Sequence, residues 1–330
     1  MAVSDSAIDQ AVQLLKQGEL VGLPTETVYG LGADAANPAA VAKIFQAKGR
    51  PADHPLIVHI ADAGQLETWA RDIPEAARLL AAAFWPGPLT LILKRQPAVP
   101  DAVTGGQDTV GLRVPGHPLA LEVLRAFTAA GGSGGVAAPS ANRFGRISPT
   151  TAAHVREELG DKVALVLDGG PCDVGIESTI LDLSGLPDAG PRLLRPGAIS
   201  PEDIKAIIGV SPTGTDDDAP RASGTLAAHY APTTPMKMLS RERVWDVLNA
   251  YRHSGRHCGV LAHSQLPQEG PHVWQPLPVD PAGYAHGLYG ALRELDHAGV
   301  ALIAVEEIPA GPAWAAVADR LRRAVCGSGG

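Results

Sequence analysis

Short apolar runs alternate with amphipathic stretches along the chain, which is the pattern of an α/β protein. Apolar residues three and four apart predict helices over residues 7–17, 38–48, 74–84, 117–129, 148–159 and 201–208. The apolar runs between them predict strands over residues 20–23, 89–93, 109–114, 136–138, 163–167, 178–183 and 192–195, and another that ends at residue 60. Many short strands mixed with helices predict a domain built on a twisted, mixed sheet.

A second, smaller domain is predicted after residue 235. Residues 209–235 are rich in Pro, Gly, Thr and Asp, which is typical of a linker. The pattern then predicts a strand from residue 236, a helix over 241–252, a strand over 259–262, a helix over 282–297, a strand over 301–305 and a helix over 313–325. This alternation favours a small parallel, Rossmann-like α/β sheet.

The stretch from residue 20 to residue 60 holds the first candidate chemistry. Asn37 is a good N-cap, Pro38 suits the first helical turn and Gly49 ends the helix. Because an extended segment follows, Lys48 and Arg50, two residues apart, are expected to point the same way. Two fixed cations suit a polyphosphate, although solvated charges at a helix C-terminus are the alternative. The hydroxyls and the carboxylate of the predicted turn at residues 25–32 favour binding.

Three more polar residues lie on or just after predicted strands. Arg113 lies in an otherwise apolar strand, so it needs either a structural ion pair or a ligand carboxylate, which a guanidinium binds in bidentate fashion. Ser140 and Asn142 follow the strand at 136–138 and should share a face. The glycines at 131–135 precede that strand instead of following one, so they are no dinucleotide fingerprint. The sequence also contains no GxxxxGK[ST] loop.

Composition narrows the class of protein. The chain has 330 residues, 45% hydrophobic and 19% charged, which is enough for two globular domains. Its net charge of -8 argues against a broad nucleic-acid surface. Three scattered cysteines form no disulfide framework or zinc motif and suit the cytoplasm. A metal site at His253, His257, Cys258 and His263 is a weaker alternative. No apolar run is long enough to cross a membrane and no signal sequence is recognisable.

Several motifs in a fixed order resemble those of the YrdC-like threonylcarbamoyl-AMP synthases. They are PTETVYGLG at 24–32, KIFQAKGRPADHPLIVHI at 43–60, APSAN at 138–142, ESTI at 177–180, LRPG at 194–197 and HYAP at 229–232. The length is similar to that of the long, two-domain form of the family. The resemblance implies a YrdC-like catalytic domain over residues 1–208, a linker or lid over 209–235 and a smaller C-terminal domain over 236–330.

The resemblance also implies the activity. Enzymes of this family make threonylcarbamoyl-AMP and pyrophosphate from L-threonine, bicarbonate and ATP, with magnesium accompanying the ATP, and so supply threonylcarbamoyl for tRNA adenosine modification. Transfer RNA or the downstream threonylcarbamoyl-transfer complex would be further partners. The alternatives are a YrdC-like carbamoyltransferase and a non-catalytic RNA-binding module. The acidic net charge argues against the RNA-binding alternative.

Site residues follow from the same resemblance. The family's central tetrad corresponds to Lys48, Arg50, Ser140 and Asn142, which would also contact ATP. The threonine-binding positions correspond to Thr27, His59, Arg113 and Ser178. Further ATP-contacting positions correspond to His54, Thr109, Ala138, Ser148, Arg195 and Tyr230.

The linker departs from the family in one respect. Family linkers usually carry basic residues just before HYAP, whereas residues 222–228 here are uncharged. Tyr230 is an unusual residue for an inert linker. It is expected either to act in a lid that excludes water from the reactive adenylate or to pack one domain on the other.

Overall fold

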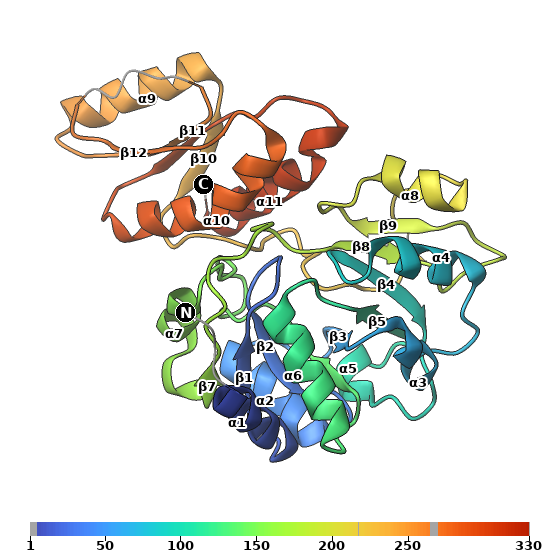
Figure 1. Ribbon diagram of the computed structural model, residues 1–330. Coiled ribbons are helices and arrows are strands. Elements are labelled where there is room, and N and C mark those ends of the chain that lie inside the picture. The colour runs from blue at the N-terminus through green and yellow to red at the C-terminus, as the bar shows by residue number, and fades with distance from the viewer. Residues whose placement is uncertain (1–4, 217, 265–269, 330) are drawn as a thin grey trace. The chain divides into compact units, whose positions relative to one another are not determined.

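The computed structural model describes residues 5–216, 218–264 and 270–329. These residues form two compact units (Figure 1). The first unit comprises Met1–Phe144, Pro149–Asp173 and Glu177–Thr225, and the second comprises Gly145–Ser148, Val174–Ile176 and Leu226–Gly330. The segment predicted as a linker is therefore divided between the two units near residue 225.

The first unit is built on a nine-stranded sheet with the order β7-β1-β2-β6-β3-β5-β4-β8-β9. Its strands are β1 (Val21–Leu23), β2 (Gly30–Asp34), β3 (Ile57–Ile60), β4 (Leu89–Lys94), β5 (Thr109–Arg113), β6 (Gly135–Ala137), β7 (Leu165–Val166), β8 (Thr179–Asp182) and β9 (Arg192–Arg195). The pairs β1/β7, β3/β5 and β4/β8 are parallel and the others are antiparallel. The predicted mixed sheet is confirmed.

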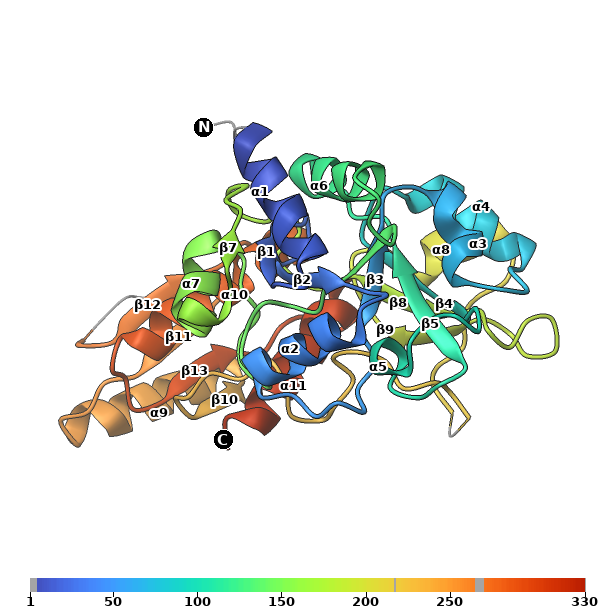
Figure 2. The ribbon, with the colours of Figure 1, turned by 90° about the horizontal axis from the view of Figure 1, so that it is seen from below.

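Helices of the first unit pack on this sheet. They are α1 (Asp5–Lys16), α2 (Pro38–Lys48), α3 (Leu66–Trp69), α4 (Glu75–Phe84), α5 (Asp101–Thr104), α6 (Pro118–Ala129), α7 (Ala152–Leu159) and α8 (Pro201–Ile208). Helices α1 and α6 lie side by side (Figure 2). The Asn37 side chain accepts hydrogen bonds from the backbone N–H groups of Ala39 and Ala40, and Gly49 ends α2 with a φ of 62°. Both predicted ends of α2 are confirmed.

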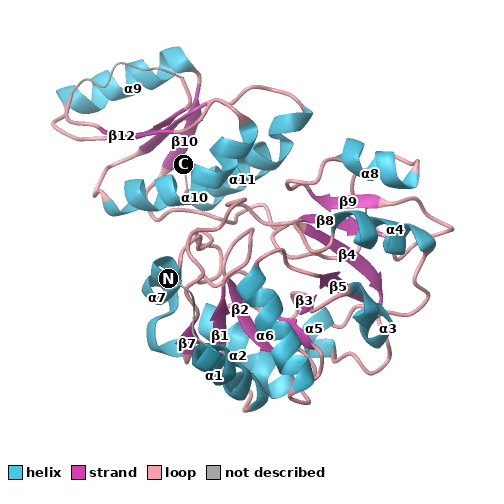
Figure 3. Ribbon diagram, in the orientation of Figure 1, coloured by secondary structure: helices cyan, strands magenta, loops and turns pink. Residues whose placement is uncertain are grey.

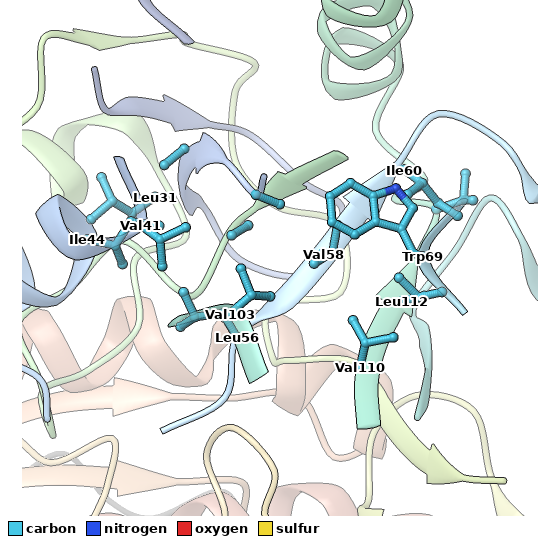
Figure 4. Packing of buried hydrophobic residues seen from close by; sticks show 14 of the residues in the cluster. Leu31, Val41, Ile44, Leu56, Val58, Ile60, Trp69, Val103, Val110 and Leu112 are labelled. Carbon is cyan, nitrogen blue, oxygen red and sulfur yellow. The ribbon is translucent and has the colours of Figure 1, made fainter. Parts of the chain in front are cut away.

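Strand alternation gives the central sheet one apolar face and one face with polar positions. Val58, Ile60, Val110 and Leu112 point into the main apolar core, which they share with Trp69 and residues of α2 (Figure 4). Since successive side chains of a strand face opposite ways, their neighbours lie on the other face. These neighbours are Ile57, His59, Thr109, Gly111 and Arg113. The predicted threonine-binding residues His59 and Arg113 and the predicted ATP-binding residue Thr109 therefore share the second face.

Four elements of the first unit differ from the sequence prediction. Residues 30–34 form β2, although the stretch 25–32 was predicted as a turn throughout. Glycine disfavours strands, but long-range pairing of Gly30, Leu31 and Gly32 with β1 overrides that preference. Helix α7 begins at Ala152, capped by the Thr151 side chain, and not at the predicted residue 148. The short helices α3 and α5 were not predicted because their few residues carry no clear period.

The second unit is a separate parallel sheet of four strands with the order β10-β13-β11-β12 (Figure 3). These are β10 (Met236–Leu239), β11 (Gly259–Ala262), β12 (Val273–Pro276) and β13 (Ile303–Glu306). Helix α9 (Arg241–His253) packs on one face, whereas α10 (Pro281–His297) and α11 (Ala315–Gly327) cover the other (Figure 3). The predicted Rossmann-like sheet is confirmed, with β12 as an additional strand that the sequence analysis missed.

Candidate active site

The loop after β1 is held by its own hydroxyl groups. Thr25 Oγ1 accepts hydrogen bonds from the backbone N–H groups of Thr27 and Val28 and lies 2.6 Å from the carbonyl oxygen of Val28. A carbonyl can only accept, so the Thr25 hydroxyl proton is used there. Thr27 Oγ1, 2.9 Å from Thr25 Oγ1, must then donate its own proton to Thr25. The lone pairs of Thr27 are left to accept hydrogen bonds from a ligand.

The same loop places a carboxylate against Arg113. Arg113 Nη2 lies 2.6 Å from Glu26 Oε1, and Arg113 Nε donates to the carbonyl oxygen of Gly87 at 3.2 Å. Both charged side chains are buried, with 5% and 11% of their surfaces exposed. Arg113 therefore has the ion pair that the sequence analysis considered as one of its two alternatives. Sequence reasoning gave Glu26 no role of its own, because only the fold brings it to Arg113.

Neutral groups surround this ion pair. His59 faces Arg113 in the register of β3 and β5. Burial and then the positive charge of Arg113 lower the pKa of His59 to about 3, so the ring is uncharged at neutral pH. Burial and then the negative charge of Glu26 raise the pKa of the Cys172 thiol to about 12. Cys172 is therefore a protonated thiol and not a nucleophile at neutral pH.

Ser178 joins this region to Arg195. The Ser178 hydroxyl lies 2.8 Å from Thr90 Oγ1 and accepts from Arg195 Nη2 at 3.1 Å, while the Ser178 carbonyl accepts from Arg195 Nε at 3.0 Å. Arg195 is 3% exposed and ends β9, and Ser178 immediately precedes β8. A predicted threonine-binding residue and a predicted ATP-binding residue are thus in direct contact.

The four tetrad residues lie on two neighbouring segments. Lys48 Nζ donates to the carbonyl oxygens of Ser140 and Asn142, the latter at 2.6 Å. Burial and then the charge of Arg50 lower the pKa of Lys48 well below its usual value. Lys48 and Arg50 are 4% and 8% exposed, so the alternative of two solvated charges is wrong. The prediction placed Lys48 and Arg50 on one extended segment, but Lys48 is the last residue of α2. The two cations are nevertheless close enough for the charge of Arg50 to lower the pKa of Lys48.

The segment before residue 225 binds two of the predicted phosphate-binding cations. Arg50 Nη2 donates to Ser223 Oγ at 3.2 Å and to the carbonyl oxygen of Pro55 at 2.9 Å. Arg195 Nη1 donates to the carbonyl oxygen of Ser223 at 2.9 Å. Ala222 packs with Ile57, on the same face of the sheet as His59 and Arg113. Sequence reasoning missed Ser223, since a lone serine in an uncharged segment carries no signal.

The remaining predicted ATP-binding residues are divided between the units. In the first unit, His54 packs edge-on against Phe144, Thr109 begins β5, and the Ala138 N–H donates to the carbonyl oxygen of Ile57. Ser148 and Tyr230 belong to the second unit. Their assignment to ATP binding stays a prediction, as does the rest of the site assignment.

Tyr230 is buried within the second unit. It is 1% exposed, stacks on Tyr289 with the ring centres 5.8 Å apart, and lies under the guanidinium of Arg320 at 5.2 Å. Its φ of 61° lies in the left-handed region, which is uncommon for a tyrosine.

Metal-ligating groups are scattered. Among residues 5–216, 218–264 and 270–329, no three His, Cys, Asp or Glu side chains are grouped so as to hold a metal ion. His263 instead lies 3.2 Å from Glu306, and the Cys258 N–H donates to His272 Nδ1. In the described part of the chain, no helix is both long and apolar enough to span a bilayer.

Comparison with known proteins covers both units. A family model described as telomere recombination matches residues 13–197, and a model of the C-terminal domain of threonylcarbamoyl-AMP synthase matches residues 199–326. The threonylcarbamoyl-AMP synthase of Bacillus subtilis is 43% identical, over 99% of this chain and 95% of that protein. The Pyrococcus abyssi synthase is 40% identical, over 95% and 92%.

A solved structure matches nearly the whole chain as well. The crystal structure of P. abyssi Sua5 complexed with L-threonine superposes with a TM-score of 0.90 at 38% sequence identity. The match covers 99% of this chain and 96% of that chain.

Proposed function

The chain belongs to the Sua5/YrdC family of threonylcarbamoyl-AMP synthases, in its two-domain form, and we propose that it makes threonylcarbamoyl-AMP from L-threonine, bicarbonate and ATP. The relatives bear this name over nearly the full length of both chains, and the P. abyssi structure contains L-threonine. The protein is then an ATP-dependent nucleotidyltransferase.

The observation that carries the proposal is the burial of two sets of cations in the first unit. Lys48 and Arg50 lie beside the Ser140–Asn142 segment, and Arg113 lies beside His59 and is paired with Glu26. Buried cations are costly unless anions compensate them. A triphosphate suits Lys48 and Arg50. Arg113 is already paired with Glu26, but a guanidinium has five N–H donors and can also bind a substrate carboxylate.

Each step of the reaction then has residues to support it. The amine of threonine attacks the carbon of bicarbonate and water leaves, which gives a carbamate. A carbamate oxygen attacks the α-phosphorus of ATP, and pyrophosphate leaves with the electron pair of the broken P–O bond. Lys48, Arg50 and Arg195 would neutralise charge on the phosphates, while Ser140 and Asn142 would fix the nucleotide. Arg113 would orient threonine, with His59 and Ser178 beside it.

Magnesium would enter as the complex with ATP. Phosphate oxygens and water are its preferred ligands, so the nucleotide can carry the ion without a dedicated cluster of protein carboxylates. The ion would neutralise charge on the pyrophosphate as it leaves.

The product would serve threonylcarbamoylation of tRNA adenosines in the cytoplasm. The described residues include three free cysteines, which suit a reducing compartment. Either tRNA itself or the downstream threonylcarbamoyl-transfer complex would receive the adenylate.

Pyrophosphate release tests the proposal. With ATP and magnesium, release should require both L-threonine and bicarbonate, and mass spectrometry should detect threonylcarbamoyl-AMP. Release at the same rate without threonine would contradict the proposal. Transfer of the carbamoyl group to another acceptor would indicate a carbamoyltransferase, and binding of RNA without any turnover would indicate a binding module.

A further inference from the structure

Glu26 is a buried carboxylate with unused hydrogen-bonding capacity. An ionised carboxylate offers about four lone-pair sites. Both oxygens of Glu26 are buried, and neither accepts a hydrogen bond from any residue that the structure describes. Its close contact is the ion pair with Arg113, at 2.6 Å but without the alignment of a hydrogen bond. Buried polar atoms are normally satisfied, so this exception needs an explanation.

Two other buried carboxylates, those of Glu306 and Asp182, do accept hydrogen bonds. Glu306 accepts from the backbone N–H groups of His263 and Ser264 and from the Ser264 hydroxyl. Asp182 accepts from the backbone N–H and the hydroxyl of Ser184. Glu306 and Asp182 are 4% and 2% exposed, comparable to Glu26 at 8%. The unsatisfied state of Glu26 is thus not a general property of buried acids in this fold.

The Glu26 carboxylate has close neighbours on more than one side. A Cβ atom on Gly116 would lie 3.2 Å from the carboxyl carbon of Glu26, which is closer than an ordinary van der Waals contact. A glycine at position 116 avoids this close contact. Arg113 lies on another side, and the negative charge of Glu26 also acts on the Cys172 thiol. Thr27, in the same loop, keeps lone pairs available to accept a hydrogen bond because its proton is donated to Thr25.

We propose that Glu26 binds the ammonium group of the amino-acid substrate, so that Glu26 and Arg113 together recognise a zwitterion. This inference rests on the proposed function, which places the substrate carboxylate on Arg113. The Glu26–Arg113 pair has no net charge and neither does the zwitterion, so the complex can be buried without a further counter-ion. Thr27 supplies a neutral second acceptor for the ammonium.

The same charge disfavours the carbamoylated product at this position. Conversion of the ammonium to a carbamate releases one proton to the solvent besides the water, and it changes the charge at the nitrogen end from positive to negative. Glu26 attracts the first and repels the second, so it favours departure of the carbamate from Glu26 once it has formed. The carboxylate thereby distinguishes substrate from intermediate.

A ligand that lacks only the ammonium group separates this role from a structural one. L-Threonine and 3-hydroxybutanoate share the carboxylate and the hydroxyl, so calorimetry on the full chain measures the contribution of the ammonium directly. One charge-assisted contact corresponds to roughly ten- to a hundredfold in affinity. The wild type should therefore bind threonine at least about tenfold more tightly than 3-hydroxybutanoate.

Glu26→Gln removes the charge at nearly constant volume. The variant should lose the preference, with affinities for the two ligands within about threefold. Glu26→Asp, which keeps the charge, should retain a preference for threonine. If Glu26→Gln weakens both ligands equally, Glu26 merely holds Arg113 in place and the proposal is wrong.

The wild type alone also tests the inference if a variant does not fold. Equal affinity of the wild type for both ligands would overturn the role of Glu26. No binding of threonine at all would instead contradict the proposed function, so the two failures are distinguishable. Circular dichroism and the midpoint of thermal unfolding report whether each variant keeps its fold.

Discussion

Replacement of Lys48 by methionine should separate the charge of this residue from its role in packing. Lys48 is 4% exposed and donates to the carbonyl oxygens of Ser140 and Asn142. Methionine has a similar aliphatic volume and no charge, so it fills the space that the lysine stem occupies. The substitution leaves two carbonyl groups without this donor and leaves Arg50 as the remaining cation of the pair.

Two effects of Lys48→Met on the free energy of unfolding have opposite signs, whereas its effect on ATP affinity is a loss only. Each carbonyl that loses its donor costs about 1–3 kcal/mol. Removal of a buried ammonium from beside Arg50 returns several kcal/mol of desolvation and repulsion, so the net change in the free energy of unfolding should stay within about 2 kcal/mol. A lost charge-assisted contact to phosphate costs roughly 1.5–3 kcal/mol, or about ten- to a hundredfold in ATP affinity.

Calorimetry with ATP and magnesium, together with pyrophosphate release, measures the effect. Lys43→Met is the matched control, because Lys43 lies on the same helix with 40% of its side chain exposed and pairs with Glu19 at the surface. The control should keep ATP affinity within about twofold. The reasoning would be refuted if Lys48→Met bound ATP as tightly as the wild type, or if the control lost as much affinity.

The pH dependence of stability provides an independent check on Lys48. Burial and then Arg50 lower the pKa of its ammonium well below 10.5. Between the lowered pKa and the ordinary one, the unfolded chain binds a proton that the folded chain does not, so the free energy of unfolding rises with pH. Denaturant titrations should show this rise in the wild type and a smaller one in Lys48→Met. Identical slopes would mean that Lys48 titrates normally.

Three further predictions concern threonine, His59 and the linker. Arg113→Ala should weaken threonine binding about ten- to a hundredfold in calorimetry. The affinity for ATP should change little. Normal threonine binding would show that Arg113 does not bind the threonine carboxylate. The pKa of His59 is lowered to about 3 by burial and then by Arg113, so its contribution to stability is present above about pH 6.5 and is lost as the pH falls toward 3. His59→Asn should therefore lose less stability than the wild type between pH 6.5 and 4 in denaturant titrations, and equal losses would place the pKa of His59 near its usual value. If the linker is a lid, ATP and threonine together should slow proteolysis within residues 211–235, and Tyr230→Ala should remove that protection. A cleavage rate that is the same with and without the ligands would show that the linker only connects the two domains.

Local sequence determined the elements that short-range rules govern. Asn37 and Gly49 specified both ends of α2, because capping depends on residues within one turn of the helix. The alternation around His59 and Arg113 specified that both lie on the opposite face from Val58 and Leu112. The order of the motifs, from residue 24 to residue 232, indicated the family before any contact between them was known.

Tertiary structure decided what depends on partners distant in sequence. The glycine-rich residues of β2 form a strand only because β1 and β6 pair with them. The pairing of Glu26 with Arg113 and the contacts of Ser223 with Arg50 and Arg195 join segments that no local periodicity relates. Propensity and spacing act over a few residues, whereas burial and charge pairing act through space. The sequence therefore identified the candidate cations of the site, and the fold determined which anions and carbonyl groups lie next to them.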